Sequence, residues 1–416
     1  MAFMKLAKSG TLSLNETMQD MRNAGRRVFQ FGFGESPFPP PKRVQEALRE
    51  WAGRTEYTPV AGLPPLREKI AEFHHEADRY PIAADQVLVA PGTKPLLYNI
   101  MQAFQPGEVY LLGPSWVSYA PQAALARHQV VPIRTTFEER WRVTSESLEA
   151  AIRTHGLADR QKLMVLNYPG NPDGLSYSRA ELEGLAEVMR AHGLWVVSDE
   201  IYALLDHTGQ HVSLATIYPE RTLVTTGVSK WCGAGGWRLG ALILPPHAPK
   251  ALLDALIGLG SETYSCAPAP IQGAALAAYQ LDSEVHQFLN AQRKVLSAIG
   301  AVIYRSLVDA GLRVHPPQGG FYLLLDFSPF ADQLARRGLS SDKRLCERLL
   351  EESGVALLPG SSFGMQSEAL TARLAYVDFD GRAALRDFAA CQFRAARHAA
   401  NMLQGIAEIS NWLRSC

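Results

Sequence analysis

Short apolar segments alternate with helical patterns from about residue 86 onward, and this alternation sets the tightest limit on the fold. Nearly every position is apolar in seven predicted strands: QVLVA, VYLLG, QVVPI, KLMVLNY, LWVVSD, TLVTTG and LGALIL. Such strands belong in a sheet that is covered on both faces. Amphipathic segments such as SRAELEGLAEVMRAHG separate several of them. Strand–helix–strand order predicts mostly parallel pairing, so we expect an α/β domain built on one seven-stranded sheet.

The pattern changes after about residue 290. The long helical segment SEVHQFLNAQRKVLSAIGAVIYRSLVDAG leads into the strand GGFYLLLDF, and the strands VALLPG and ARLAYVDF follow. The sequence therefore predicts a large domain over residues 51–290 and a smaller α+β domain over residues 291–416. Residues 1–50 are expected to form an N-terminal arm and part of the smaller domain. A helix with ends at Asn15 and Gly25 is expected in this arm, and another from about Arg382 through the tail.

Composition excludes several classes of protein. Hydrophobic residues make up 47% and charged residues 20%, a globular balance that excludes a disordered or collagen-like chain. Lysine plus arginine equals aspartate plus glutamate, 41 each, so no net field attracts nucleic acid or an anionic membrane. No apolar run approaches the roughly 18 residues of a membrane span. The five cysteines are scattered without a C-x-x-C pair, which argues against disulfides and a metal site and predicts a cytoplasmic protein.

The strongest chemical signal is the segment TTGVSKWCGAGGWRLG. In it Lys230 follows an apolar strand, and Arg238 lies in a glycine-rich turn. A lysine amine in this setting can form a Schiff base with an aldehyde cofactor while an arginine holds the cofactor's phosphate. From this segment alone, a surface lysine in a loop is an equally good interpretation.

The segment VVSDEIYALL places Asp199 at the end of another apolar strand, where open α/β sheets bind their ligands. A carboxylate there can pair with a protonated pyridine nitrogen and keep the ring electron-poor. Tyr202 can hydrogen-bond a phenolic oxygen on the same ring. The structural alternative is an aspartate that caps the next helix.

Three further segments follow apolar strands, and each has a structural alternative. Asn171 precedes Pro172 in NYPGNPDG, where the X-Pro bond can be cis and aim a side chain, although a plain turn also fits. Thr93 and Lys94 stand at a helix start in VAPGTKPLLY, which can cradle a phosphate. Trp116 in GPSWVSY can stack on a ring or lie in the core. Together the five segments supply a phosphate cradle, a stacking ring, ligands for an oxygen and a nitrogen, and an amine.

The order and spacing of these motifs resemble those of the fold-type I pyridoxal-phosphate enzymes, specifically the class I/II aminotransferases of the aspartate-aminotransferase kind. The resemblance extends from about residue 10 to about residue 390 and includes YTPVAGLPPLREKIA, PGSSFG and ARLAYV. It implies pyridoxal 5′-phosphate as cofactor, and an aminotransferase that moves the amino group of an L-amino acid to a 2-oxo acid by a ping-pong mechanism. A β- or γ-lyase, a cyclase or an oxidase of amino acids shares the first steps and is the alternative.

The resemblance also implies a role for each matching residue. Lys230 carries the cofactor as a Schiff base and moves the proton, and Asp199 pairs with the pyridine nitrogen. Arg373 of ARLAYV takes the substrate α-carboxylate, beside Asn171 and the backbone of Gly34. The other residues implied to hold the cofactor are Thr93, Lys94, Trp116, Asn171, Tyr202, Ser229 and Arg238.

A homodimer is implied as well, because Tyr57 is expected to reach the phosphate in the neighbouring subunit. The segment near Tyr264 is expected to border that neighbouring site. Two positions depart from the family pattern: Gly227 stands where a phosphate-binding serine is common, and Asp173 replaces the threonine of N-P-T-G. Ser229 is the candidate to replace the missing serine.

Two unrelated enzyme classes are weaker interpretations. Residues 360–364 match G-x-S-x-G, and Asp378 and His398 follow in the order of a hydrolase triad. Too little chain remains after this segment, however, to build a hydrolase sheet. The glycines at residues 32–34 and 233–236 do not complete G-x-G-x-x-G, which argues against a nicotinamide enzyme.

Overall fold

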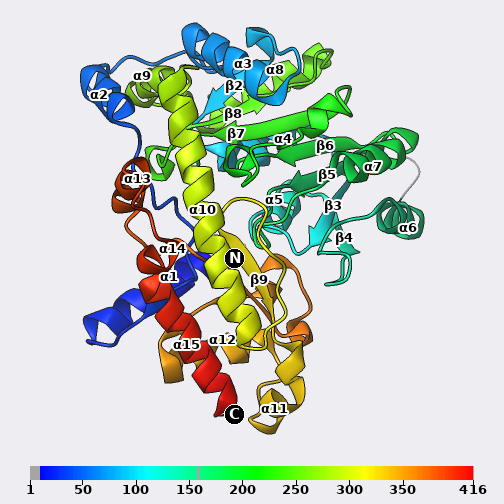
Figure 1. The fold of residues 1–416 in the computed structure, drawn as a ribbon. Helices are drawn as coiled ribbons and strands as arrows, with labels where there is room; N and C mark the ends of the chain where they lie inside the picture. The colour runs from blue at the N-terminus through cyan, green and yellow to red at the C-terminus, as the bar shows by residue number, and fades with distance from the viewer. Residues whose placement is uncertain (1–9, 157–159, 416) are drawn as a thin grey trace, which may run out of the picture.

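The computed structural model describes residues 10–156 and 160–415 of the chain, and a central sheet dominates them (Figure 1). The sheet has seven strands in the order β2-β8-β7-β6-β5-β3-β4. Their bounds are β2 Val87–Ala90, β3 Glu108–Gly113, β4 Gln129–Arg134, β5 Lys162–Asn167, β6 Trp195–Asp199, β7 Thr222–Gly227 and β8 Gly240–Ile243. The predicted seven-stranded sheet is therefore confirmed, with its strands at the predicted segments.

Strand β8 runs antiparallel to both of its neighbours, whereas the other pairs in the sheet are parallel. The connection from β7 to β8 spans only residues 228–239 and contains no α-helix. A parallel return would need a longer crossover, usually a helix, so the chain turns back instead. This short connection carries Lys230 and Arg238 at the edge of the sheet where β7 ends.

Helices cover both faces of the sheet. Val109 and Leu111 of β3 pack in one layer, and Tyr110 and Leu112 of the same strand pack in the opposite layer. This alternation explains why nearly every strand position is apolar. The first layer contains α4 (Thr93–Ala103), α5 (Tyr119–Leu125) and α8 (Lys250–Thr263), and the second contains α6 (Ser145–His155) and α7 (Arg179–Ala191).

A second, antiparallel sheet is ordered β11-β12-β9, with bounds β9 Tyr322–Asp326, β11 Leu358–Pro359 and β12 Thr371–Ala375. In a separate pair, β1 (Phe29–Gln30) runs parallel to β10 (Val355–Ala356), so the N-terminal segment pairs with a C-terminal element. The long helix α10 (Ser283–Asp309) lies alongside both parts of the molecule (Figure 1). The exact domain boundaries, at residues 50 and 290, stay predictions.

The remaining helices surround these sheets. They are α1 (Gly10–Asn23), α2 (Lys42–Trp51), α3 (Pro64–Asp78), α9 (Ala269–Ala278), α11 (Ala331–Arg336), α12 (Asp342–Ser353), α13 (Gly381–Ala389), α14 (Ala395–His398) and α15 (Ala400–Arg414). In the part of the chain that the structure describes, no helix combines the length and the apolar character that crossing a membrane requires.

Helix bounds at the two chain ends differ from those predicted. Helix α1 already includes Gly10, the first residue that the structure describes, so Asn15 lies within the helix rather than at its start; the helix ends at Asn23, just before the left-handed Gly25 with φ 76°. The single helix expected from Arg382 is instead α13, α14 and α15, and the left-handed Cys391 with φ 56° follows α13. The break lets α13 pack on α10 while α15 packs on both α10 and α12, which one straight helix cannot do.

Candidate active site

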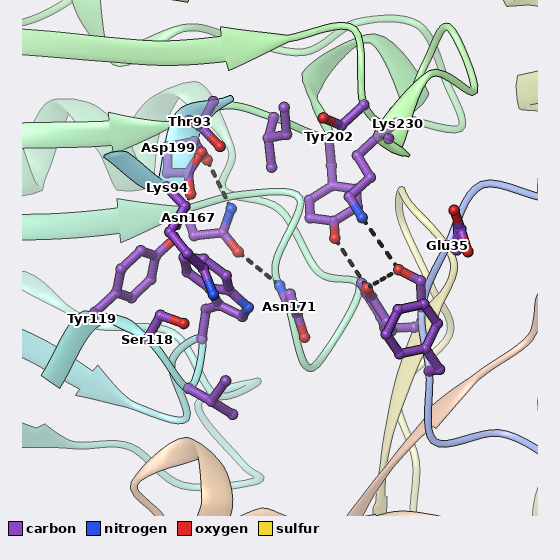
Figure 2. A pocket seen from close by; sticks show the side chains of 18 of the residues that line it. Glu35, Thr93, Lys94, Ser118, Tyr119, Asn167, Asn171, Asp199, Tyr202 and Lys230 are labelled. Carbon is purple, nitrogen blue, oxygen red and sulfur yellow. Dashed lines mark hydrogen bonds between the residues drawn. The ribbon is translucent and has the colours of Figure 1, made fainter. Parts of the chain in front are cut away.

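A cavity of about 410 Å³ lies between the carboxyl ends of the central strands and the strands β9 and β12 (Figure 2). The predicted segments meet there because parallel strands bring their carboxyl ends to one edge of a sheet. Figure 2 shows Asn171 between two groups of side chains, with Asp199 and Lys94 on one side and Tyr202 and Lys230 on the other. The predicted residues that line the cavity are Gly34, Thr93, Lys94, Trp116, Asn171, Asp199, Tyr202, Ser229, Lys230, Arg238 and Arg373.

Asp199 ends β6 and is buried, with 4% of its surface exposed. Tyr119 Oη donates to its Oδ2 at 2.6 Å, and Thr225 Oγ1 donates to its Oδ1 at 3.0 Å. Burial raises the pKa of Asp199 to about 6, and the two hydroxyl donors act against this rise. The donors that the described residues supply to this carboxylate are neutral, so a cationic group of a ligand would complete the site.

We expect this buried carboxyl to make the ligand-free protein less stable as the pH rises. Its pKa moves from an ordinary 3.8 to about 6, so the folded state binds more protons than the unfolded state between these values. Two pKa units correspond to about 3 kcal/mol. The measured quantity is the free energy of unfolding of Asp199→Asn minus that of the unchanged protein. This difference should therefore increase by up to about 3 kcal/mol between pH 4 and pH 8.

Urea unfolding of both ligand-free proteins across this pH range measures the difference. Asp254→Asn on the exposed face of α8 is the matched control and should give a difference that varies little with pH, because its carboxyl is exposed. A constant difference between Asp199→Asn and the unchanged protein would show that Asp199 titrates normally.

Lys230 approaches the cavity from the connection between β7 and β8. Its Nζ donates to the backbone oxygen of Gly34 at 3.2 Å and lies 5.7 Å from the centre of the Tyr202 ring and 5.8 Å from that of Phe321. A dashed line marks the hydrogen bond from Lys230 in Figure 2. These partners are a neutral carbonyl and two aromatic rings. Among the described residues no carboxylate forms an ion pair with this amine, and its place in the cavity suits it to act as a nucleophile and as a base.

The end of the cavity next to α4 has the donors of an anion site. Gly92 is the left-handed residue before α4, with φ 98°, and any side chain there would collide with the Arg238 guanidinium. Arg238 donates to the Gly235 oxygen at 2.8 Å, and the Lys94 ammonium lies 4.9 Å from the centre of the Trp116 ring. Burial and the nearby Arg238 lower the pKa of Lys94. Two cations thus converge with the first N–H groups of a helix, as phosphate binding requires.

Arg373 projects from β12 at the opposite end and is only 2% exposed. Its Nη1 donates to Asn171 Oδ1 at 2.9 Å, its Nη2 donates to the backbone oxygen of Gly32, and its buried Nε has no partner among the described residues. The guanidinium lies 4.7 Å from the centre of the Tyr322 ring and 5.0 Å from that of Phe363. A buried cation with neutral partners and an unused donor fits a carboxylate ligand.

The two departures from the family pattern have structural explanations. Gly227 pairs with Gly240 on β8, and a Cβ at Gly227 would lie 2.7 Å from the backbone oxygen of Leu239, so a serine does not fit without a backbone shift. Ser229 does line the cavity. Asp173 is buried and forms an ion pair with the buried Arg142, away from the cavity lining.

Several residues of the site were not predicted from the sequence. Tyr119 and Thr225 hold Asp199, and Tyr322 lines the cavity next to Tyr202. Asn167 Nδ2 donates to the Asp199 backbone oxygen at 2.8 Å, and its Oδ1 accepts from the Asn171 N–H at 2.8 Å. Tyr119 and Asn167 do stand in the motifs GPSWVSY and NYPGNPDG, so their place after a strand was a usable signal.

The structure corrects the prediction about the cis peptide bond, whereas the roles of Tyr57 and Tyr264 at a neighbouring subunit's site stay predictions. The cis peptide bonds lie at Gly113–Pro114 and Tyr168–Pro169 rather than at Asn171–Pro172. Tyr57 does not line the cavity of this chain; 89% of its surface is exposed. Tyr264 is half-buried, and burial raises its pKa to about 12.

The hydrolase alternative has no assembled triad. His398 pairs with Asp387 at 3.2 Å, whereas Asp378 accepts a hydrogen bond from Asn401 at 2.6 Å. A nucleophile, base and orienting acid must form one chain of hydrogen bonds, and these residues do not. Within residues 10–156 and 160–415, no group of three or more His, Cys, Asp or Glu side chains is arranged to hold a metal ion.

The fold and the cavity together define an α/β enzyme. Its site has an anion cradle at one end, a buried arginine at the other, and a lysine and a buried carboxylate between them. Such a site suits a phosphate-bearing cofactor and a carboxylate-bearing substrate.

Comparison with known proteins identifies the kind of enzyme. The family model "Aminotransferase class I and II" matches residues 26–378. An aspartate aminotransferase of Geobacillus stearothermophilus is 35% identical over 87% of this chain and 92% of its own length, and an aspartate/prephenate aminotransferase of Thermus thermophilus is 33% identical over 85% and 89%. The solved structure of the Thermus thermophilus aspartate aminotransferase with maleate has a TM-score of 0.82 at 31% identity, covering 94% of this chain and all of that one.

The chain therefore belongs to the class I and II aminotransferase family. It is an aminotransferase, which moves the amino group of an amino acid to a 2-oxo acid, and the resemblance stated from the sequence is confirmed. The comparisons favour this activity over the lyase, cyclase and oxidase alternatives. The family generally depends on pyridoxal phosphate.

Proposed function

We propose that the cavity holds pyridoxal 5′-phosphate and that the residues predicted from the sequence bind it. The observation that carries this proposal is a set of three groups that face one cavity with only neutral partners among the described residues. They are the Asp199 carboxylate, the Lys230 amine and the Arg373 guanidinium. Each complements a different group: a protonated ring nitrogen, an aldehyde and a substrate carboxylate. The cradle of Lys94, Arg238 and the start of α4 complements the phosphate.

When bound, pyridoxal phosphate supplies an aldehyde and an electron-poor ring that can accept the electron pair left by removal of an α-proton. Asp199 keeps a proton on the ring nitrogen, because a buried carboxylate gains most from a cation next to it. Tyr202 would donate to the ring oxygen from its place beside Lys230. Asn171 Oδ1 accepts from Arg373, so its Nδ2 would be the group that donates to the same oxygen.

The remaining residues bind the substrate and move its proton. Arg373 binds the α-carboxylate through its guanidinium and so fixes the direction of the α C–H bond. Lys230 Nζ would take the α-proton and would return it to the carbon on the other side of the transferred nitrogen, because it is the cavity amine that lies outside the phosphate cradle. Trp116 covers the site on one side and limits its exposure to water.

The amino donor depends on what binds its side chain. The relatives named above act on aspartate according to their names. In this chain the arginines that line the cavity are Arg238 and Arg373, and the proposal uses both. Among the described residues, a second carboxylate of the donor would therefore find no further arginine in the lining. Assays of aspartate, alanine and aromatic amino acids with 2-oxoglutarate or pyruvate as acceptor identify the donor class.

A half-reaction tests the proposed function directly. An L-amino acid is added to the loaded enzyme without any 2-oxo acid acceptor, and the cofactor absorbance and the released products are followed. We expect one 2-oxo acid per site, no ammonia, and resumption of turnover when an acceptor is added. Continuous release of ammonia without an acceptor would instead identify a lyase or an oxidase.

We further propose that the enzyme is a cytoplasmic homodimer with Tyr57 acting in the partner's site. Tyr57 is the most exposed large hydrophobic side chain in the described residues, at 89%, although the neighbouring Thr58 is buried. A phenol held out from an ordered segment in this way is suited to contact a second copy of the chain. Among the described residues, Cys232, Cys266, Cys346 and Cys391 are free thiols, which is compatible with a reducing compartment.

Hybrid dimers test this arrangement. A Lys230→Ala variant and a Tyr57→Ala variant should each have low activity, because every site in them lacks one of the two residues. Mixing them with subunit exchange should restore about a quarter of wild-type activity, because half of the subunits join a hybrid dimer and each hybrid has one intact site. The measurement is activity after exchange, with exchange proven by mass labelling. Complete exchange without recovery would place Tyr57 outside the partner's site.

A further inference from the structure

Tyr322 connects the two ends of the site, although the sequence motifs did not single it out. It begins β9 and is 2% exposed. Its Oη lies 3.0 Å from Tyr202 Oη and donates to the backbone oxygen of Gly34 at 3.3 Å. The Arg373 guanidinium lies over its ring, 4.7 Å from the ring centre. One side chain thus touches the tyrosine beside Lys230, the carbonyl that binds Lys230, and the buried arginine.

The glycine at residue 34 leaves the space that the Tyr322 side chain occupies. A Cβ added to Gly34 would overlap the Tyr322 hydroxyl and ring, so the position has to be glycine while Tyr322 keeps this orientation. The Tyr202 and Tyr322 rings meet edge to face, with centroids 5.6 Å apart and planes at 82°. Both rings are buried and closely packed, so each hydroxyl has few alternative partners.

Counting protons shows that this network has two arrangements. Tyr322 has one hydroxyl hydrogen, so it cannot donate to Gly34 and to Tyr202 at the same time. When Tyr322 donates to Gly34, Tyr202 satisfies the contact by donating to Tyr322. When Tyr202 donates to an acceptor in the cavity, its oxygen can only accept from Tyr322, and Gly34 then loses that donor.

We propose that Tyr322 is a positioning residue whose hydroxyl shifts its hydrogen bond from Gly34 to Tyr202 when Tyr202 donates into the cavity, while its ring supports Arg373. This inference rests on the cofactor site proposed above. Accepting a hydrogen bond makes a hydroxyl a stronger donor, so Tyr322 strengthens the hydrogen bond that Tyr202 gives to the cofactor's ring oxygen.

The pH at which the loaded enzyme changes its absorption spectrum measures this role apart from activity. A hydrogen-bond donor to the cofactor's ring oxygen stabilises the negative charge on that oxygen. It therefore lowers the pH at which the neighbouring Schiff-base nitrogen loses its proton. Removing the Tyr322 hydroxyl in Tyr322→Phe should therefore raise the midpoint by about 0.5 pH unit. Tyr202→Phe should raise it further, and Tyr322→Phe added to Tyr202→Phe should cause no additional shift, because the hydroxyl acts through Tyr202.

The ring has a separate readout. Tyr322→Phe keeps the ring, so the KM for the amino acid should stay within about twofold, whereas Tyr322→Leu should raise it by about fivefold or more. Tyr376→Phe is the matched control: this phenol is also buried, and it donates to the Gly320 oxygen at 3.2 Å outside the cavity lining. It should leave both the midpoint and the KM unchanged.

A midpoint that Tyr322→Phe does not move, or shifts that add in the double variant, would overturn the role of the hydroxyl even if Tyr322→Leu does not fold. These outcomes leave the cofactor site intact, because the loaded enzyme still shows its absorption band. A wild-type protein that acquires no band with pyridoxal phosphate would overturn the cofactor site and this inference together.

Discussion

Replacing Lys230 with alanine is expected to lower turnover by at least about 10⁴-fold, because the change removes the nucleophile and the base together. The Lys230 amine lies in the cavity with the Gly34 carbonyl at 3.2 Å. The other lysine among the lining residues is Lys94, whose ammonium lies beside Trp116 and close to Arg238 at the opposite end. No second amine in the lining is placed to take over.

Two measurements check this result. Steady-state turnover gives the loss of activity, and borohydride reduction of the loaded enzyme followed by peptide mapping gives the attachment site. The adduct should map to Lys230 in the wild type and be absent from Lys230→Ala. Lys250→Ala is the matched control, since Lys250 is an exposed residue of α8 paired with Asp254, and it should keep both activity and adduct. An adduct on a different lysine, or near-normal turnover of Lys230→Ala without added amine, would contradict the assignment.

The sheet and the clustering of the predicted residues were predictable from the sequence for the same physical reason. Strands buried on both faces are apolar at nearly every position, so polar residues such as Asp199 and Lys230 stand out where each strand ends. Parallel pairing then brings those ends to one edge, and the residues that follow β2, β3, β5, β6 and β7 line one cavity. The order of the motifs along the chain was therefore sufficient to predict which residues cluster at the site.

The rest of the site depends on contacts that no local pattern records. Thr225 looks like an ordinary residue of β7, and its role comes from the register that sets it opposite Asp199 on β6. Tyr322 looks like a core aromatic in GGFYLLLDF until the position of β9 brings its hydroxyl next to that of Tyr202. Gly227 looks like a lost ligand until the backbone of β8 is seen to occupy the space of a side chain.

The helices after Arg382 also could not be predicted from local sequence pattern alone. Helical periodicity continues from Arg382 onward, but the chain breaks near Cys391, and after the break α15 packs on both α10 and α12. Propensity within a segment says little about such a break, because tertiary packing decides it.

Replacing Arg373 with alanine is expected to lower kcat/KM for the amino acid by about 10² to 10³-fold, mainly through KM, because truncating one partner of a buried charged pair costs about 2–5 kcal/mol. The guanidinium has only neutral partners in the described residues and a buried Nε without one, so the substrate carboxylate supplies its missing anion. Cofactor affinity should change by no more than a few fold, because the phosphate cradle is at the other end of the cavity.

Arg373→Lys separates charge from geometry. Lysine keeps the positive charge but cannot bind a carboxylate through two parallel N–H groups, so kcat/KM should fall by about tenfold, between the wild type and the alanine variant. Arg190→Ala, which removes an exposed arginine paired with Glu220, is the control and should change neither constant. Steady-state kinetics and cofactor titration of the three variants measure both effects. Loss of cofactor with an unchanged KM in Arg373→Ala would place Arg373 in the cofactor site instead, and equal activity of Arg373→Lys and the wild type would mean that charge alone binds the substrate.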